Sequence, residues 1–454
     1  MSYPSYPGYK SAVTHWVQTV PSHWEVAPVR SFVNERNRKN HEGQNDNYLS
    51  LMANIGVIPY ADKGDIGNKK PDDLSRCKIV KKGDLLLNSM NYGIGSYGIS
   101  PYDGVCSPVY IILTPVAEKA NNRHALRIFE NKEFQKLAQS FGQGILSHRA
   151  AIGWEDIKNL KVPLPPLEEQ TQIARFLDHQ TARIDALIAE QQRLIELLKE
   201  KRQAVISHAV TKGLDPDVAM KDSGVEWLGE VPEHWEITRI RWVLQELTYG
   251  FTNPMPTVDE GPKMLTANDI GWGKIFYDTA RETSRYAYKT LLTPKSRPVD
   301  GDVLLTKDGT LGRVATHDGR EACINQSVAL LRPHAQKIMP EFLTTMLQAS
   351  NYQGKMIFDA GGTTIKHIYI TRLSEMAIAL PPRQEQASLI NSIKSDDYFY
   401  GEMIEKATQA ISLLYERRST LISAAVTGKI DVRDWEPPVS ETFPQSTTSE
   451  EAPA

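Results

Sequence analysis

Few residues in this sequence could do chemistry, and none of them forms a catalytic constellation. VTGKI at 426–430 comes nearest to a phosphate-binding loop, but it lacks the first glycine and the hydroxyl residue that such a loop needs. Asp72, Asp73 and Lys78 could resemble a nuclease cluster, but PDDLSRCK is more typical of a solvated turn. GIGSYG at 93–98 follows a predicted strand without opening a helix, which disfavours nucleotide binding. We therefore predict that the chain has no catalytic residues and carries no cofactor of its own.

The cysteines and the charge balance further limit the classes of protein to which this chain can belong. Cys77, Cys106 and Cys323 are far apart and show no metal-ligand spacing, so we expect no metal site, no disulfide framework and a reducing compartment. The 52 basic and 55 acidic residues nearly balance, so net charge does not by itself indicate nucleic-acid binding. The first ten residues contain no apolar signal segment, and no run of 18 apolar residues occurs. The sequence predicts a soluble, cytoplasmic protein with no membrane partner.

Two stretches of closely similar sequence are the elements that must position any functional residues. The stretch 164–215 begins LPPLEEQ and ends AVTKGLD, and 380–431 begins LPPRQEQ and ends AVTGKID. Each has a Pro-Pro pair, acidic or amide residues in the first turn, and then about 45 residues without proline. Such a pattern predicts one long helix, placed twice in the chain.

The apolar residues of these helices form a narrow seam with alternating short and seven-residue steps, which is typical of coiled-coil pairing. The simplest partner for each helix is the other helix, although two separate docking sites on partner proteins remain an alternative. The predicted seam consists of Ile173, Leu177, Ile184, Ile188, Ile195 and Leu198 in the first helix, and Leu389, Ile393, Tyr400, Ile404, Ile411 and Leu414 in the second.

The repeat extends to the segments in front of the helices. VPSHWE at 20–25 returns as VPEHWE at 231–236, and each opener precedes a globule of about 145 residues. Both globules contain a Gly-Asp entering an apolar strand, at 83–84 and 301–302, followed by a polar loop and a second strand. We expect further strands near Val109–Thr114 and Val328–Leu331, and helices near His124–Ser140 and Pro340–Tyr352. Each globule is thus predicted to be mixed α+β, with loops that carry its individuality.

These elements predict six consecutive regions. The ranges are 1–162 for the first opener and globule, 163–213 for the first long helix, 214–230 for a polar connector, 231–378 for the second globule, 379–430 for the second long helix, and 431–454 for a disordered acidic tail.

In this arrangement the chain resembles the specificity (S) subunit of type I restriction–modification systems. The resemblance rests on the twin HWE openers, the twin Gly-Asp strands and the twin LPP-x2-EQ helix starts, which cover nearly the whole chain in order. The first opener departs from the pattern, because SAVTHW at 11–16 stands where the second copy has DSGVEW at 222–227.

The resemblance implies a fold of two tandem target-recognition domains separated by two long antiparallel helices with pseudo-two-fold symmetry. It implies double-stranded DNA as ligand, and two methyltransferase (modification) subunits and restriction/translocase subunits as partners. S-adenosylmethionine, ATP and Mg would then be bound by those partners. Because the two globules differ in sequence, we expect the two half-sites of the DNA target to differ in base sequence. We also expect the number of unspecified base pairs between the half-sites to follow the length of the helices.

Base reading needs polar side chains on loops that reach a groove, and phosphates attract exposed cations. For any one loop residue, a solvated surface role remains at least as good an interpretation as a DNA contact. The candidates are Arg36, Arg38 and Lys39 near the start of the first globule; Asn88, Ser89, Asn91 and Tyr92 after its Gly-Asp strand; Ser147, His148 and Arg149 in its late turn; and Thr306, Lys307, Asp308, Thr310, Arg313, Thr363, Thr364 and Lys366 in the second globule. A coiled-coil scaffold with protein-binding globules, and a self-contained nuclease or methyltransferase, are the alternatives.

Overall fold

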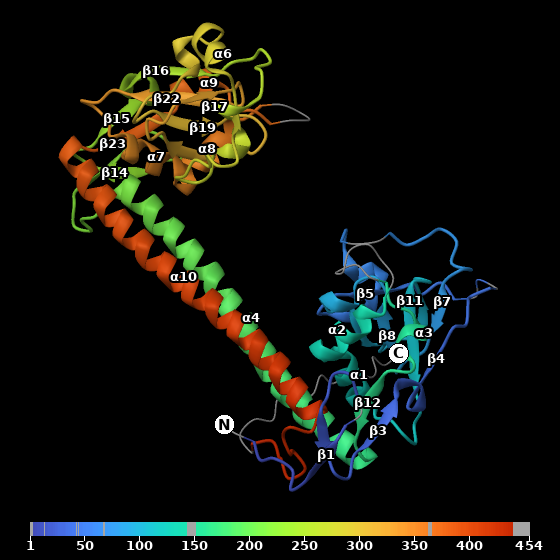
Figure 1. Ribbon diagram of the computed structural model, residues 1–454. Helices are drawn as coiled ribbons and strands as arrows, with labels where there is room; N and C mark the ends of the chain where they lie inside the picture. Colours follow the sequence, from blue (N-terminus) through green and yellow to red (C-terminus); the bar gives the residue numbers. More distant parts are fainter. Residues whose placement is uncertain are drawn as a thin grey trace, which may run out of the picture. The chain divides into compact units, whose positions relative to one another are not determined.

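The computed structural model describes residues 3–12, 14–41, 43, 45–66, 69–142, 151–361 and 366–438. The chain divides into two compact units (Figure 1). Unit 1 comprises Met1–Gln191 and Ala410–Ala454, and unit 2 comprises Gln192–Gln409. Each unit therefore holds one globule together with one part of each long helix, α4 (Leu167–Lys212) and α10 (Arg383–Val426).

Unit 1 is a mixed α+β globule made mostly of short strands. Its other elements in chain order are β1 (Tyr9–Ser11), β2 (Thr19–Pro21), β3 (Glu25–Pro28), β4 (Val33–Glu35), β5 (Leu49–Met52), β6 (Gly56–Pro59), β7 (Lys78–Val80), β8 (Leu85–Asn88), β9 (Tyr97–Ile99), β10 (Gly104–Cys106), β11 (Tyr110–Pro115), α1 (Asn122–Glu130), α2 (Lys132–Ser140), α3 (Trp154–Ile157) and β12 (Lys161–Leu164).

Unit 2 has the same kinds of elements in a similar order. They are β13 (Met220–Asp222), β14 (Glu230–Pro232), β15 (Glu236–Arg239), α5 (Ile240–Val243), β16 (Leu244–Tyr249), β17 (Val258–Leu265), β18 (Arg281–Glu282), α6 (Arg285–Thr290), β19 (Val303–Thr306), β20 (Val314–Thr316), β21 (Ala322–Ile324), β22 (Val328–Pro333), α7 (Pro340–Gln348), α8 (Ser350–Asp359), α9 (Ile370–Glu375) and β23 (Ala377–Leu380).

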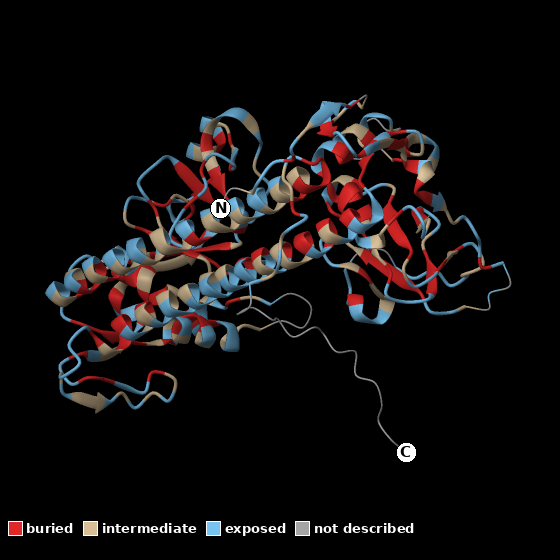
Figure 2. Ribbon diagram, turned by 90° about the horizontal axis from the view of Figure 1, so that it is seen from below, coloured by how far each residue is buried: buried red, intermediate tan, exposed pale blue. Residues whose placement is uncertain are grey.

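A common frame is built twice. The first and last strands of each globule pair antiparallel, β3 with β12 and β15 with β23. Each globule also has a four-stranded sheet, in the order β4-β11-β8-β9 in unit 1 and β16-β22-β19-β20 in unit 2. The central strands of the two sheets, β11 and β8 in unit 1 and β22 and β19 in unit 2, are largely buried, and buried strands appear red in Figure 2. Beyond this frame the units differ, because unit 1 adds the pairs β5-β6 and β10-β7, whereas unit 2 adds the three-stranded sheet β18-β17-β21.

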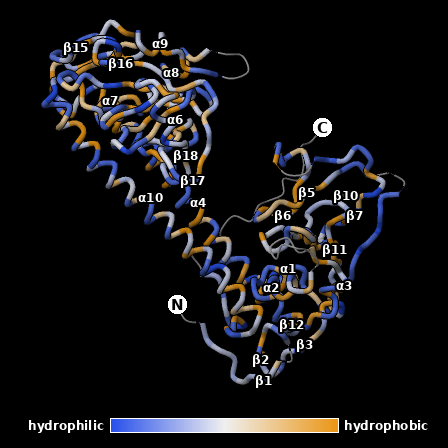
Figure 3. The backbone as a smooth tube through the Cα atoms, turned by 45° about the horizontal axis from the view of Figure 1, so that its top comes forward, coloured by the Kyte–Doolittle hydropathy of each residue, from blue (hydrophilic) through white to orange (hydrophobic). Residues whose placement is uncertain are grey.

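The two long helices pack together antiparallel, as Figure 1 shows. In unit 1, Ile173 and Leu177 near the start of α4 share a core with Ile422 and Val426 near the end of α10. In unit 2, the end of α4 and the start of α10 share another core. Hydrophobic residues alternate with hydrophilic ones along both helices (Figure 3), which fits a narrow contact face.

The helix ends follow local backbone chemistry. The carbonyl oxygens of Pro166 and Pro382 accept the hydrogen bonds of the Gln170 and Gln386 amides, at 2.9 and 3.0 Å. Gly213 and Gly428, just beyond the last turns, have φ values of 78° and 73°, a conformation that glycine adopts at low cost. The predicted ranges 163–213 and 379–430 therefore overstate the helices, since they include the ends of β12 and β23 and the Pro-Pro pairs.

Three further expectations are corrected. The single helix expected near His124–Ser140 is two helices, because the Asn131 side chain accepts bonds from the amides of Glu133 and Phe134 and caps α2. The helix expected near Pro340–Tyr352 likewise ends at Gln348, and α8 starts at Ser350. The expected connector contains β13, which pairs with β14 in a hairpin.

The tail does not begin at 431 as expected. Asp431 donates its amide to the Pro4 carbonyl at 2.7 Å, and Val432 is buried. The Trp435 ring stacks edge-on against Phe176, with ring centroids 5.2 Å apart. These apolar contacts hold 431–438 against the start of α4, and 439–454 lie outside the described residues.

Candidate nucleic-acid interface

The Gly-Asp motif of each globule fixes the loop that was expected to face DNA. Asp84 accepts bonds from Arg36 Nε at 2.8 Å and from the Lys81 amide at 2.8 Å. Asp302 accepts bonds from Arg332 Nε at 2.9 Å and from the Val299 amide at 2.8 Å. Both aspartates are buried, and hydrogen bonds to Asp302 raise the pKa of Arg332 further. The two carboxylates are thus structural groups that tie a turn to a strand.

Arg36 is consequently half-buried and held by Asp84, rather than free to meet a phosphate. Arg38 and Lys39, two and three residues further on, are exposed. Only the second part of this predicted basic cluster is therefore available for an electrostatic contact.

In unit 1, the candidate residues after β8 likewise include side chains that are held by the fold and one that is exposed. Asn88 is buried, and its Oδ1 accepts the Met90 amide at 3.1 Å. Ser89 donates its hydroxyl to the Ile152 carbonyl at 2.7 Å. Tyr92 is 1% exposed and donates to the Phe129 carbonyl, and burial raises the pKa of its hydroxyl well above the usual value. Asn91 alone of these four is exposed.

In unit 2 the loop between β19 and β20 is held by its own side chains. The buried Thr306 hydroxyl donates to the Thr310 carbonyl at 2.5 Å and accepts the Arg313 amide at 2.9 Å. Asp308 accepts from Lys307 Nζ at 2.6 Å and pairs with His367 Nδ1 at 2.6 Å. Thr306 and Lys307 therefore shape this loop from inside.

The outward-facing candidates of unit 2 are fewer than predicted. Thr310 and Lys366 are exposed, and Arg313 and Asp308 are half-exposed. Five further candidates lie outside the described residues, namely Thr363 and Thr364 of unit 2 and Ser147, His148 and Arg149 of unit 1.

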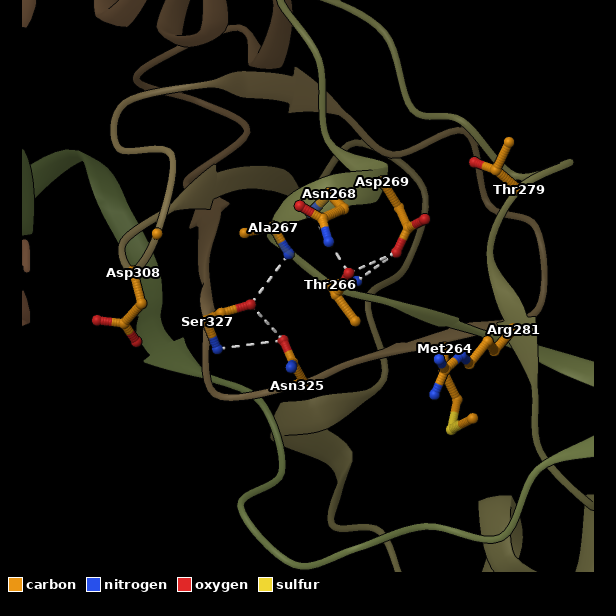
Figure 4. Close-up of a pocket in the computed structure, with 11 residues that line it drawn as sticks. Met264, Thr266, Ala267, Asn268, Asp269, Thr279, Arg281, Asp308, Asn325 and Ser327 are labelled. Carbon is orange, nitrogen blue, oxygen red and sulfur yellow. Dashed lines mark hydrogen bonds between the residues drawn. The ribbon is translucent and has the colours of Figure 1, made fainter. Parts of the chain in front are cut away.

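A cavity of about 640 Å³, lined mostly by residues of polar type, opens beside this loop in unit 2 (Figure 4). Asp308 and Gly309 line one side of it, and Arg281 of β18 lies on the opposite side in the close-up. Asn268 follows β17 in the chain, and Asn325 and Ser327 lie between β21 and β22. A cavity of this size can admit the edge of a base or a phosphate.

Short hydrogen bonds hold the cavity wall in place. Asn325 Oδ1 accepts the Ser327 hydroxyl at 2.6 Å, and Ser327 Oγ accepts the Ala267 amide at 3.0 Å. Asp269 accepts both the amide and the hydroxyl of Thr266, at 2.8 and 2.7 Å. Because these donors are already used, the wall is preformed.

Two of the lining side chains remain available. Among the described residues, none forms a hydrogen bond or ion pair with the exposed side chains of Asn268 and Arg281. Asn and Arg are the residue types that read adenine and guanine edges bidentately. Sequence reasoning selected Asp308 of this cavity and missed Asn268, Arg281 and Asn325. The parallel pairing of β17 with β21, which brings them together, joins strands almost sixty residues apart and leaves no local signal.

The opener of each unit is clamped to the start of its helix by a Glu-Gln pair. His23 Nε2 and Trp24 Nε1 lie 2.8 and 2.9 Å from the two carboxylate oxygens of Glu169. His234 and Trp235 make the same contacts with Glu385, at 2.8 and 3.0 Å.

The glutamine that follows each of these glutamates also makes the same kind of contacts in both units. Gln170 Nε2 donates to the carbonyls of Lys119 and Pro165, both at 2.9 Å, and Gln386 Nε2 donates to Lys337 and Pro381 at 2.9 and 3.0 Å. The twin motifs are therefore the joints between globule and helix.

The predicted seam residues divide evenly between buried and half-buried side chains. Six are buried, namely Ile173, Leu177, Ile184, Ile188, Leu389 and Ile393. The other six are half-buried, namely Ile195, Leu198, Tyr400, Ile404, Ile411 and Leu414.

The described part of the chain offers neither a metal site nor a membrane-spanning helix. No group of three or more His, Cys, Asp or Glu side chains there could hold a metal ion. No helix there combines the length and the apolar character that crossing a membrane requires.

Relatives of known type match most of the chain. The MjaVIII specificity subunit of a type I restriction enzyme from Methanocaldococcus jannaschii is 25% identical over 429 residues, which is 91% of this chain and 95% of that protein. The EcoBI specificity subunit of Escherichia coli is 25% identical over 283 residues, covering 60% of this chain and 59% of that protein.

Solved structures show the same fold. A chain from a structural study of complex assembly and conformational transition in the type I R-M system aligns with a TM-score of 0.69 at 15% identity, over 90% of this chain and 99% of that one. The HsdS subunit from Thermoanaerobacter tengcongensis aligns with a TM-score of 0.51 at 15% identity, over 92% of this chain and all of that one.

The sequence model of one family, described as Type I restriction modification DNA specificity domain, matches residues 21–197 and 257–395. These ranges include most of both globules and more than half of the 454 residues. The chain therefore belongs to the type I restriction–modification DNA specificity family.

Proposed function

We propose that this chain is the non-catalytic DNA-recognition subunit of a type I restriction–modification complex, and that each globule reads one half of an asymmetric, bipartite target. The observation that carries the proposal is the frame built twice with different contents. Both units share the opener, the four-stranded sheet and the helix joint, but their additional sheets differ. Equal frames suit two-fold related half-sites, and unequal contents suit different base sequences.

In unit 2 the cavity beside β17, β18 and β21 is our proposed reading element. Asn268 and Arg281 supply the free amide and guanidinium, and Asp308 and Asn325 supply further polar atoms. A bidentate contact to one base is worth roughly 1–3 kcal/mol of discrimination.

The partners follow from the helices. Each unit carries exposed apolar side chains on α4 and α10, which solvent alone does not explain. They are Leu187, Leu413 and Tyr415 in unit 1, and Leu194, Leu197, Tyr398 and Phe399 in unit 2. We propose that two modification subunits dock along these helices and bring S-adenosylmethionine, and that restriction/translocase subunits bring ATP and Mg. The three buried free cysteines accord with a cytoplasmic location.

The test is to co-express the chain with the modification subunit encoded in the same genome and to map adenine methylation. We expect one bipartite motif. The variants Asn268→Ala and Arg281→Ala should relax the bases of one half-site only. Arg320→Ala, an exposed arginine of unit 2 paired with Asp318 outside the cavity, is the matched control and should leave the motif unchanged.

Absence of methylation at any bipartite motif would contradict the proposed function. If the cavity variants changed both half-sites, independent reading by the two units would be wrong. Adding one helical turn, about 5 Å, to both long helices should lengthen the gap by one or two base pairs.

A further inference from the structure

A second pair of cavities lies where each globule meets the start of its helix. The cavity of unit 1 has about 300 Å³ and that of unit 2 about 360 Å³. Six lining residues are of identical type in the two cavities: His23 and His234, Glu25 and Glu236, Lys119 and Lys337, Leu164 and Leu380, Pro165 and Pro381, and Pro166 and Pro382.

The walls of both cavities are rigid for the same reason. The side chains of Gln170 and Gln386 are almost completely buried, and each bridges the loop in front of a globule helix to the Pro-Pro segment. The pairs β3–β12 and β15–β23 contribute Glu25 and Leu164 in one unit and Glu236 and Leu380 in the other. Each site is therefore preformed.

Folding alone does not explain why exposed residues keep their type here. Glu25 and Glu236 are exposed, and no described residue pairs with either carboxylate. The type of His23 and His234 is explained by their contacts with Glu169 and Glu385, whereas the two exposed glutamates have no such partner. Exposed substitutions usually change stability by less than about 0.5 kcal/mol, so the fold would tolerate different residues at these places.

We propose that the twin cavities are two copies of one docking site, and that each receives a short segment of one modification subunit. This inference rests on the proposed function, in which the partner that occurs twice is that subunit. The unpaired glutamate calls for a lysine or arginine of the partner, and the Leu and Pro-Pro floor calls for an adjacent apolar side chain.

The experiment uses the full chain co-purified with the modification subunit, and native mass spectrometry counts the subunits without DNA. The wild-type chain should carry two. Glu25→Lys and Glu236→Lys should each leave one, with affinity for the lost subunit reduced at least about tenfold. The double variant should carry none. Asp65→Lys and Glu260→Lys, exposed acids outside the cavities, should keep two.

A photo-crosslinking residue at Ser31 or Thr238, which line the cavities, should label the modification subunit. If both charge-reversal variants kept two subunits, or if the crosslink reached a second copy of this chain instead of the modification subunit, the docking site would be refuted. Methylation of a bipartite motif by the same wild-type complex would show that the proposed function survives that failure. A wild-type chain that captures no modification subunit would overturn both.

Discussion

The two globules are fastened to the same helix pair by different chemistry. In unit 1, Glu130 at the end of α1 accepts from Arg127 of α1 at 2.5 Å and from Arg418 of α10 at 2.6 Å. Arg127 also reaches Asp178 of α4 at 2.8 Å, and Arg418 reaches Asp185 at 3.0 Å. Besides the Glu-Gln clamp, unit 1 thus has a second joint, a network of charges around the buried Arg127 and Glu130.

In unit 2 the corresponding joint is apolar. Leu343, Met346 and Leu347 of α7 share one core with Leu389 and Ile393 of α10. Hydrogen bonds at its rim join Gln203 to the Gln348 carbonyl at 2.8 Å and Ser207 to Ser350 at 2.9 Å. The frame thus fixes where a globule attaches, whereas the attaching side chains are free to be ionic or apolar.

The charged joint should be the more fragile one when a single partner is removed. Glu130→Gln removes the carboxylate that the buried Arg127 and the half-buried Arg418 share and leaves each arginine with one aspartate, at a cost of about 3 kcal/mol. Hydrogen exchange of α1 amides should show this loss, while α7 amides keep their protection. Glu133→Gln, an exposed acid paired with Lys136, should change α1 by less than about 1 kcal/mol. Equal losses in α1 and α7 would mean that the units do not open independently.

The apolar joint should respond to volume instead. Met346→Ala removes a fully buried side chain and should cost about 3 kcal/mol in unit 2, measured by the same exchange of α7 amides. Leu291→Ala, at a side chain 61% exposed in the same unit, is the control and should cost little. An unchanged α7 would show that the core does not hold this helix.

Lowering the pH should weaken the charged joint of unit 1 before the apolar joint of unit 2, without any mutation. Burial would raise the pKa of Glu130, but the charges of Arg127 and Arg418 outweigh it and lower the pKa below its usual 4.5. A lowered folded-state pKa gives stability that is present above about pH 4.5 and is lost as the pH falls further. The protection factors of the α1 amides should therefore fall below pH 4.5 before those of the α7 amides. Simultaneous loss in both helices would contradict the contrast.

The smallest effect concerns the helix pair itself within unit 2. Arg202 and Asp397 form an ion pair whose side chains are 40% and 43% exposed. A double-mutant cycle with Arg202→Ala and Asp397→Ala should give a coupling of about 0.5 kcal/mol that disappears at high salt. A coupling several times larger would place this pair on the level of the buried network.

The sequence predicts the shared frame of the two units well, because the helix periodicity and the proline and glycine residues at the ends of elements are local features. The seam residues, the Pro-Pro stops and the Gly-Asp strands are each recognisable within a few residues. The buried charges escape such reasoning, since the sequence around Arg127 and Glu130 does not show that Arg418, almost three hundred residues away, lies against them. The cavity of unit 2 escapes for the same reason, because Asn268 and Asn325 meet only through a parallel strand pair. Tyr92 and Thr306 were chosen as polar loop residues, and burial shows that they serve the fold.

The strand pairs β3–β12 and β15–β23 have a consequence for how such proteins change over generations. Because the first and last strands of a globule are neighbours, the chain leaves the frame and returns to it at one place. Genetic exchange between these two points can replace everything in between, whatever its length, without altering the phase of the following helix. A globule with different contents can thus be acquired in one recombination event, while the joints between globule and helix stay as they were.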